Sequence, residues 1–266
     1  MQVTLDEIVT ATRGKASARR SSADRRQLEQ LAQRHVPRGL KRALMQRSSE
    51  GTAVIAELKK ASPSRGVIRA DFDVGSLAKE LEEARAAALS VLTDEEFFQG
   101  SLENLRCASA ATRLPCLQKD FIVDEFQILE ARANWADAVL LIVAALSQAD
   151  LVKLAKAADT LDLDVLCEVH DESELHRGVD AGCTLIGVNS RDLRTFEVDL
   201  QTTFRLAKFL PKNIVAVAES GIRDLTDIAK LRAAGYKAFL IGESLMKAAH
   251  PGAMLRGLLA ADAVAK

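Results

Sequence analysis

Eight short apolar runs, spread over residues 54–242, constrain the fold of this chain more than any other feature. Their first residues lie 20 to 35 residues apart, which suits the roughly 30 residues of a parallel strand–helix–strand crossover better than a hairpin. Near-continuous Val, Ile and Leu runs are typical of strands that are covered on both faces. The runs are VIAEL (54–58), LSVLT (89–93), PCLQK (115–119), AVLLIV (138–143), DVLCEV (164–169), TLIGVN (184–189), IVAVAES (214–220) and KAFLIG (237–242).

Stretches with helical periodicity separate these runs. Ser147 and Asp224 stand where a helix N-cap is expected, and Gly182 and Gly235 stand where a helix would end. Eight strand–helix units of this length predict an α/β fold, namely a (β/α)8 TIM barrel. An open doubly wound sheet is the alternative, but such sheets usually have fewer strands, and no G-x-G-x-x-G sequence follows any run. The clearest helical stretches are SLAKELEEARAA (76–87), SQADLVKLAKAADTL (147–161) and DLTDIAKLRAAG (224–235).

Residues 1–50 lie outside this repeat and predict a helical N-terminal extension. Thr4 and Glu7 have the spacing of a capping box, and Pro37 and Gly39 mark a break between two helical pieces. We expect one or two amphipathic helices that pack on the barrel with their charges solvated. Nucleic-acid binding is not expected, because acidic residues are interspersed among the basic ones and no aromatic residues alternate with them.

The composition is that of a folded enzyme or binding module. Apolar residues make up 48% and charged residues 27%, and the net charge is −1, which excludes a disordered chain and gives no overall attraction to nucleic acid. The longest apolar run, Ala138 to Leu146, is too short to cross a membrane. The start of the chain does not have the pattern of a signal peptide, and the four cysteines lack metal-ligand spacing, so we expect a cytoplasmic protein with reduced core thiols. No long linker divides the chain, so residues 1–266 are interpreted as one barrel domain that includes the extension.

Polar residues end five of the eight runs, at the edge where the active site of a TIM barrel lies. Glu57 and Lys59 share one side of the first strand, because residues two apart point the same way, and Leu58 takes the other side. Leu58 should pack against helices, which directs the charged pair into the barrel. The other polar strand ends are Gln118-Lys119-Asp120, Cys167-Glu168, Asn189-Ser190-Arg191 and Glu219-Ser220.

Two lysines, three glutamates and an asparagine that converge from different strands predict a site for proton transfer. Ionised groups are costly to bury unless they are paired or change their pKa, so their convergence on one mouth is a signature of function. Lys119 is the candidate general acid and Glu168 the candidate base. The alternative is an interior salt-bridge cluster with no chemistry.

A phosphate site is predicted beside this cluster. Ser220-Gly221 and Gly242-Glu243-Ser244 follow the last two runs, where small residues at a helix start offer backbone N–H groups to an anion. The side chain of Glu243 must then point away from the phosphate. The polar loop 62–66 can close over the site.

Other residues with chemical potential are less informative. Phe97 and Phe98 follow the second run and are interpreted either as core or as the cover of an aromatic substrate. The four histidines have no metal-ligand spacing, so no metal site is predicted. No Ser/His/Asp or Cys/His arrangement that would support nucleophilic catalysis is apparent.

Seven segments together resemble the indole-3-glycerol phosphate synthase family. The similarity covers nearly the whole chain, including the helical extension, and the combination of the first three segments is highly specific. It implies conversion of 1-(2-carboxyphenylamino)-1-deoxyribulose 5-phosphate to indole-3-glycerol phosphate with loss of CO2 and water, a step of tryptophan biosynthesis that needs no cofactor or metal. The segments are IAELKKASPSRG (55–66), SVLTDEEFFQGS (90–101), LQKDFIVDEFQ (117–127), LCEVHDESEL (166–175), IGVNSRDLRTFEVD (186–199), AESGI (218–222) and FLIGESLM (239–246).

The resemblance also implies a role for each matching residue. Lys119 looks like the general acid that assists ring closure at the carbonyl carbon, and Glu168 like the base or a second acid–base group in the dehydration. Glu57 and Lys59 would orient the substrate, with Lys59 near its carboxylate. The remaining implied contacts are Asn189 and Ser220 in the catalytic site, Arg191 and Glu219 at the substrate, Ser62, Gly221, Gly242 and the backbone of Glu243 at the phosphate, and Phe98, Phe121 and Leu240 along the apolar wall.

Five residues depart from the family's pattern. Gln118 replaces a common Arg beside the acid lysine, and Ser190 replaces a common second Asn, and both changes are close enough to the site to alter activity or pH dependence. Arg85, Trp135 and Asp162 replace glycines at helix ends, where the exchange costs roughly 1 kcal/mol of stability.

Two alternative functions follow from the same residues. One is another sugar-phosphate isomerase or lyase barrel of the same pathway, which the intact KDF and CEVH segments disfavour. The other is a catalytically inactive barrel that still binds a phosphorylated ligand, which the retained Lys119 and Glu168 disfavour. The expected partner is the small anthranilate-derived ribulose phosphate, with no nucleic acid or membrane, and the protein is expected to be a monomer or a weak homodimer.

Overall fold

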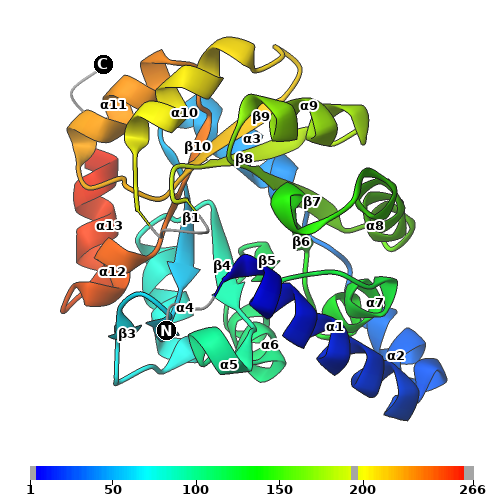
Figure 1. Cartoon of the computed structure of the whole chain (residues 1–266). Coiled ribbons are helices and arrows are strands. Elements are labelled where there is room, and N and C mark those ends of the chain that lie inside the picture. The colour runs from blue at the N-terminus through cyan, green and yellow to red at the C-terminus, as the bar shows by residue number, and fades with distance from the viewer. Residues whose placement is uncertain (1–3, 193–196, 261–266) are drawn as a thin grey trace.

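The computed structural model of the chain describes residues 4–192 and 197–260. It confirms the predicted barrel, because eight parallel strands close on themselves in the order β1-β10-β9-β8-β7-β6-β5-β4 (Figure 1). The strands are β1 (Ala53–Leu58), β4 (Ala88–Leu92), β5 (Cys116–Lys119), β6 (Ala138–Ile142), β7 (Asp164–Val169), β8 (Leu185–Asn189), β9 (Val215–Glu219) and β10 (Ala238–Ile241). Each corresponds to one predicted run to within a residue or two at either end.

Helices surround the barrel and connect consecutive strands (Figure 1). The longer ones are α4 (Val74–Glu83), α6 (Leu102–Ala111), α7 (Glu125–Ala133), α8 (Gln148–Thr160), α9 (Glu172–Asp180), α10 (Leu200–Leu206), α11 (Leu225–Ala233) and α13 (Pro251–Leu259). Shorter elements are α5 (Glu95–Phe98), α12 (Glu243–Lys247), the 3-10 turns η1 (Val143–Ala145) and η2 (Ala207–Phe209), and the antiparallel pair β2 (Ala61–Ser62) and β3 (Gly66–Val67).

The predicted helix ends are confirmed. The side chain of Ser147 accepts a hydrogen bond from the backbone of α8, and that of Asp224 does the same for α11. Gly182 and Gly235, which follow α9 and α11, have φ of +83° and +112°, a conformation that glycine adopts without strain.

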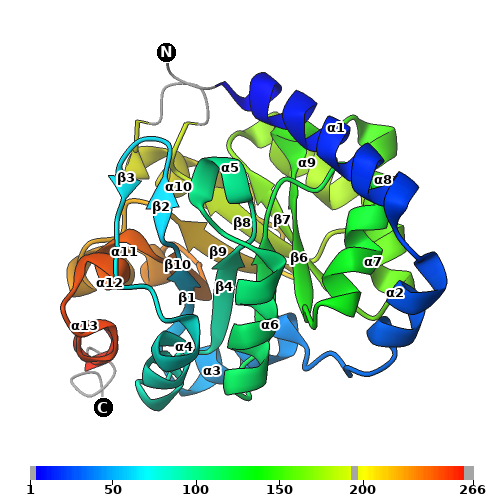
Figure 2. The same cartoon turned by 90° about the horizontal axis from the view of Figure 1, so that it is seen from below.

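The extension contains three helices rather than the predicted one or two, namely α1 (Leu5–Ser22), α2 (Arg25–Ala32) and α3 (Leu40–Glu50). The capping box of Thr4 and Glu7 begins α1 as predicted, and the break at Pro37 and Gly39 separates α2 from α3. The additional helix was not predicted because the chain turns between α1 and α2 without a Pro or Gly. Figure 2 shows α1 running across one end of the barrel beside α7 and α8.

Side chains of the extension contribute to the core inside the barrel. Leu40 and Leu44 of α3 and Ile8 of α1 belong to the same buried cluster as inward-facing strand residues such as Ile55 and Leu117. This cluster is distinct from the larger one between strands and surrounding helices, which includes Leu58 as predicted. The extension therefore helps to fill the barrel interior.

A buried ion pair attaches the segment before α3 to the barrel. Asp137, which precedes β6 and is fully buried, accepts hydrogen bonds from Nη2 of Arg38 at 2.6 Å and from Nε2 of His35 at 3.0 Å. Its carboxylate also accepts from the backbone N–H groups of Arg38 and Cys116, each at 2.6 Å. Arg38 donates further to the hydroxyl of Ser109. Burial would raise the pKa of Asp137, but these donors outweigh it and hold the pKa below its ordinary value.

The three residues that replace glycines are in the left-handed conformation that glycine prefers. Arg85, Trp135 and Asp162 have φ of +71°, +66° and +57°, and each follows a helix directly before a strand. Side chains with a Cβ adopt this conformation at a cost of about 1 kcal/mol. The structure therefore agrees with the predicted strain at all three positions.

Replacing Arg85 by glycine is expected to raise the free energy of unfolding by about 1 kcal/mol and to leave turnover unchanged. Arg85 is exposed and far from the polar strand ends, so the change relieves strain without altering the site. Urea unfolding of the purified variant measures the gain. Gly235→Ala is the matched reverse change, since nothing lies within 4 Å of an added Cβ and only backbone strain is introduced. A stability that is unchanged in both variants would contradict the argument.

The cysteines fit the sequence interpretation with one exception. Cys116, Cys167 and Cys183 are buried and free, whereas Cys107 is free but exposed on α6, so it is not a core thiol. Within the described part of the chain, no helix combines the length and hydrophobicity needed to span a bilayer.

Candidate active site

Strand alternation directs the polar strand ends into the mouth of the barrel. Leu117 of β5, Leu166 of β7 and Val217 of β9 all belong to the buried interior cluster. The residues two positions later, Lys119, Glu168 and Glu219, therefore point to the same side, above that cluster. The apolar layer thus forms the floor of a pocket and the charged layer its lining.

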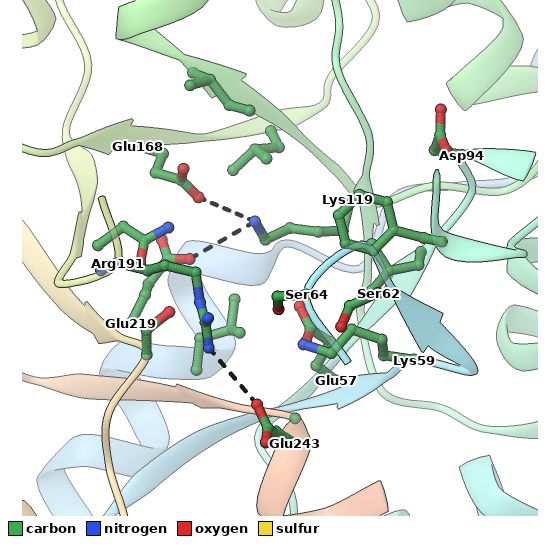
Figure 3. Close-up of a pocket in the computed structure, with 18 of the residues that line it drawn as sticks. Glu57, Lys59, Ser62, Ser64, Asp94, Lys119, Glu168, Arg191, Glu219 and Glu243 are labelled. Atoms are coloured by element: carbon green, nitrogen blue, oxygen red, sulfur yellow. Dashed lines mark hydrogen bonds and ion pairs between the residues drawn. The ribbon is translucent and has the colours of Figure 1, made fainter. Parts of the chain in front are cut away.

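All the residues that the sequence analysis assigned to the site line this one pocket at the C-terminal end of the strands (Figure 3). They are Glu57, Lys59, Ser62, Phe98, Lys119, Phe121, Glu168, Asn189, Arg191, Glu219, Ser220, Gly221, Leu240, Gly242 and Glu243. The structure therefore brings the predicted proton-transfer and phosphate sites into one cavity.

The ammonium of Lys119 lies among carboxylates. Its Nζ donates to Oε2 of Glu168 at 3.0 Å and lies 3.9 Å from Oε2 of Glu219 (Figure 3). Burial alone would lower the pKa of Lys119, but Glu168, Glu219 and Glu57 outweigh it and raise the pKa above its ordinary value. The surrounding carboxylates thus favour the charged ammonium form of Lys119 in the free protein.

The two carboxyl groups beside Lys119 differ in charge. Burial would raise the pKa of Glu168, but Lys119 and His170 together hold it well below its usual range. Burial and the negative charge of Glu168 raise the pKa of Glu219 to about 8. Gly187 of β8 makes room for Glu219, because a Cβ at position 187 would collide with Oε1 of that side chain. The surroundings therefore favour a negative charge on Glu168 and a retained proton on Glu219.

Glu57 and Lys59 form a second charged pair on the other side of the mouth. Nζ of Lys59 donates to Oε2 of Glu57, and both side chains line the pocket as the alternation of β1 predicts. Gly242 allows this arrangement, because a Cβ there would lie 2.9 Å from the Cβ of Glu57 and would collide with its carboxylate. Gly242 is therefore needed to leave space for the Glu57 carboxylate as well as for any ligand.

The loop after β9 exposes backbone groups to the pocket. Ser220 and Gly221 have φ of +64° and +73°, two consecutive left-handed residues. The hydroxyl of Ser190 donates to the carbonyl oxygens of Glu219 and Ser220, each at 3.0 Å, and so supports this turn. Serine in place of the common second Asn is thus a structural support of the loop.

The carboxylate of Glu243 is surrounded by cations. It lies 2.5 Å from Nζ of Lys247, 3.3 Å from Nε of Arg65 and 3.6 Å from Nη2 of Arg191. Figure 3 shows the Arg191 contact at the edge of the pocket. These three cations neutralise the charge of the Glu243 carboxylate. Their contacts are consistent with the prediction that this side chain points away from a bound phosphate.

Aromatic and aliphatic side chains form the opposite wall. The rings of Phe98 and Phe121 lie 6.3 Å apart and are tilted by 40°, and Leu240 lines the pocket from β10. Leu5 and Ile8 of α1 add to this wall. Sequence reasoning missed these two, because only the tertiary position of the extension brings them to the mouth.

Three acid–base residues at the site were given no role by the sequence analysis, although Asp120 was noted there as a polar strand end. Asp94 and Asp120 line the pocket, and burial raises the pKa of both. His170 follows β7, and its Nε2 lies 3.4 Å from Oε1 of Glu168. The signal available was adjacency, since each follows a predicted strand end. Gln118, by contrast, is not among the residues that line the pocket, and its amide donates to Asp120 at 3.3 Å.

Among the residues that the structure describes, no group of three or more His, Cys, Asp or Glu side chains is arranged to hold a metal ion. The four glutamates of the pocket are instead paired with lysine, arginine or histidine, whereas Asp94 and Asp120 accept hydrogen bonds from neutral groups.

The sequence and the fold both match known proteins. The family model for indole-3-glycerol phosphate synthase matches residues 5–258. The indole-3-glycerol phosphate synthase of Koribacter versatilis is 58% identical over 259 residues, which are 97% of this chain and 100% of that protein. That of Acidithiobacillus ferrooxidans is 51% identical over 223 residues, 84% of this chain and 85% of that protein. A solved structure of 3-hexulose-6-phosphate synthase superposes with a TM-score of 0.64 at 14% identity, covering 79% of this chain and 99% of that one, and supports the barrel fold alone.

Proposed function

The chain belongs to the indole-3-glycerol phosphate synthase family of lyases in tryptophan biosynthesis, and from this premise we propose how its pocket works. The substrate is 1-(2-carboxyphenylamino)-1-deoxyribulose 5-phosphate. A carbon–carbon bond forms between the aromatic carbon that bears the carboxylate and the carbonyl carbon of the ribulose chain. CO2 leaves from that aromatic carbon, and the former carbonyl oxygen, once protonated, leaves as water.

Lys119 is the general acid that gives a proton to the carbonyl oxygen. The observation that carries this assignment is the position of its charged ammonium, 3.0 Å from Glu168, in a pocket whose other wall contains Phe98 and Phe121. Because Glu168 holds the ammonium in the free protein, the substrate carbonyl must replace this carboxylate as the acceptor before the proton is transferred. An ammonium released from its carboxylate in a buried site becomes a stronger acid.

Glu168 is the base that removes a proton during dehydration. Its low pKa keeps it ionised, and the displacement of Lys119 makes it available. Lys59 pairs with the carboxylate of the substrate before decarboxylation, and Glu57 orients Lys59. Asn189 and Ser220 complete the polar part of the catalytic site, and Glu219 contacts the substrate.

The phosphate group binds at the loops that follow β9 and β10. Gly221 and Gly242 allow the backbone to approach the ligand, and Ser62 and the backbone N–H of Glu243 add donors. Arg191 contacts the substrate from the loop after β8. The aromatic ring lies against Phe98, Phe121 and Leu240.

Residues 1–266 form one domain whose extension (1–50) takes part in the site. The buried pair of Arg38 and Asp137, and the presence of Leu5 in the pocket, support this proposal. The protein acts on its small-molecule substrate without a cofactor, as a monomer or weak homodimer in the cytoplasm. Light scattering at increasing protein concentration measures the oligomeric state.

An assay of the purified protein tests this function. Incubation with the anthranilate-derived ribulose phosphate is expected to give indole-3-glycerol phosphate, detected by its absorbance and fluorescence, in step with released CO2. Folded protein that gives no product would refute the proposal. Turnover of a neighbouring sugar phosphate instead would favour a related isomerase or lyase, and saturable binding without turnover would favour an inactive barrel.

A further inference from the structure

Two buried carboxyl groups compete for one ammonium in this pocket. Lys119 lies 3.0 Å from Glu168 and 3.9 Å from Glu219, and both glutamates are at most 2% exposed. Two buried carboxyl groups that share one ammonium are costly to ionise together, which favours a retained proton on one of them. The unequal distances to Lys119 favour charge on Glu168, but they differ by less than 1 Å.

His170 adds a second cation to one of the two carboxyl groups. Its Nε2 lies 3.4 Å from Oε1 of Glu168, on the side opposite to the oxygen that Lys119 contacts. The imidazole is held from behind, because its Nδ1 lies 3.0 Å from Oε2 of Glu174 and the backbone N–H of His170 donates to the same oxygen at 2.8 Å. Only 16% of the His170 side chain is exposed. The ring therefore lies between two carboxylates: it is hydrogen-bonded to Glu174 and within ion-pair distance of Glu168, to which its Nε2 makes no hydrogen bond in the described structure.

The charged groups around the two glutamates differ, and this difference favours a negative charge on Glu168 rather than on Glu219. Glu168 on β7 faces Lys119 from β5, His170 from the start of the β7–α9 loop and Glu219 from β9. Glu219 is influenced by Glu168, Lys119 and His170, and also by Glu57 from β1, whose carboxylate is paired with Lys59. The one ion pair of Glu219 among the described residues is the longer one with Lys119. Within the described residues its Oε1 is buried without a hydrogen-bond partner, which suits a neutral carboxyl group better than an ionised one.

We propose that His170 is a positioning residue that fixes the negative charge on Glu168 and leaves Glu219 as a neutral acid. The directions of the pKa shifts agree with this assignment. Burial would lower the pKa of His170, but Glu168 and Glu174 raise it to about 10, so the imidazole is charged at neutral pH. The loss of this cation must raise the pKa of Glu168 and raise that of Glu219 by less, because His170 is paired with Glu168 and has only a minor influence on Glu219.

For the reaction, this inference rests on the proposed function. Glu168 is the ionised base of the pocket and Glu219 is the neutral proton donor. His170 favours this assignment over the reverse one. A pair of titratable groups with pKa values driven apart by their surroundings is the arrangement that acid–base catalysis requires. Glu174 acts through His170, because it holds the imidazole in place and keeps it charged.

Titration of the glutamate side-chain carboxyl carbons by NMR tests the inference without turnover. Glu168→Gln and Glu219→Gln assign the two signals. In His170→Gln, the midpoint of Glu168 is expected to rise by about one to three pH units and that of Glu219 to rise by less, so that the two midpoints move closer together. A larger shift at Glu168 than at Glu219 is a readout that a general loosening of the fold does not produce. His176→Gln changes an exposed histidine on α9, the helix that follows His170, and should leave both midpoints unchanged.

Glu174→Gln is a second route that leaves His170 itself intact. The imidazole loses one of its two carboxylates, so a histidine midpoint should appear at lower pH, and Glu168 should shift in the same direction as in His170→Gln but by less. Equal midpoints for Glu168 and Glu219 in the wild type, or midpoints that stay fixed in both variants, would overturn the inference. Absence of synthase activity in the wild type would instead refute the proposed function and leave these titrations interpretable.

Discussion

Replacing Lys119 by alanine is expected to lower kcat by about a hundred- to ten-thousandfold, the contribution that a positioned general acid makes to a proton transfer. The variant has no ammonium at the pocket to protonate the carbonyl oxygen, and Glu168 loses its closest cation. The measurement is kcat for indole-3-glycerol phosphate formation, with circular dichroism to establish that the barrel remains folded.

The control for this prediction is Lys153→Ala. Lys153 lies on α8 and is 62% exposed, with a surface ion pair to Glu125 that contributes little to stability. Its replacement removes a lysine of equal charge without touching the pocket, so kcat should be unchanged. A Lys119→Ala variant that is folded and turns over at a near-normal rate would show that another group supplies the proton.

Replacing Arg38 by methionine is expected to lower the free energy of unfolding by about 3 kcal/mol or more. Asp137 is fully buried, and the loss of its guanidinium partner leaves a carboxylate that the remaining donors compensate only in part. Urea unfolding of the wild type and the variant gives the difference. Methionine keeps most of the apolar length of the side chain, so the measured loss reports the charge and its hydrogen bonds.

The pH dependence of the stability lost in Arg38→Met is a further check, because its sign follows from the pKa of Asp137. The pKa of Asp137 is lowered in the folded protein, so the stabilisation is present above the ordinary aspartate pKa and is lost as the pH falls through the folded value. The wild type and the variant should therefore converge in acid. Arg20→Met, which breaks an exposed pair with Asp124, should cost under about 1 kcal/mol. An equally small loss of stability in Arg38→Met and Arg20→Met would contradict the claim that Arg38 and Asp137 form a stabilising buried ion pair.

The barrel was predictable because its pattern is local and repeated. Each strand is buried on both faces and so appears as a continuous apolar run, and each crossover requires a helix of fixed length. The charged strand ends followed from the same regularity, since strand alternation places Lys119 two positions after Leu117 and Glu168 two after Leu166. Phe121 and Leu240, by contrast, were named only from the resemblance to the family. The left-handed conformation of Arg85 was predictable from its position at a helix end.

The features that were missed depend on contacts between distant segments. Nothing in LDEI at the start of α1 indicates that Leu5 and Ile8 reach the pocket, because that requires the docked position of the extension. The one function considered for His170 was metal binding, and only the turn into α9 brings its ring between Glu168 and Glu174. The net pKa of Lys119 was likewise beyond reach, since it depends on how many carboxylates surround one ammonium.

The most direct test of the account is a crystal structure of the protein with indole-3-glycerol phosphate bound. The account predicts the phosphate against the backbone N–H groups of Gly221 and Glu243, the indole ring against Phe98 and Phe121, and Nζ of Lys119 within reach of the ring carbon that was the carbonyl carbon. A product whose ring lies at the phosphate loops, or whose closed ring lies away from Lys119, would contradict the claim that charged groups from separate strands act on a single bound sugar phosphate.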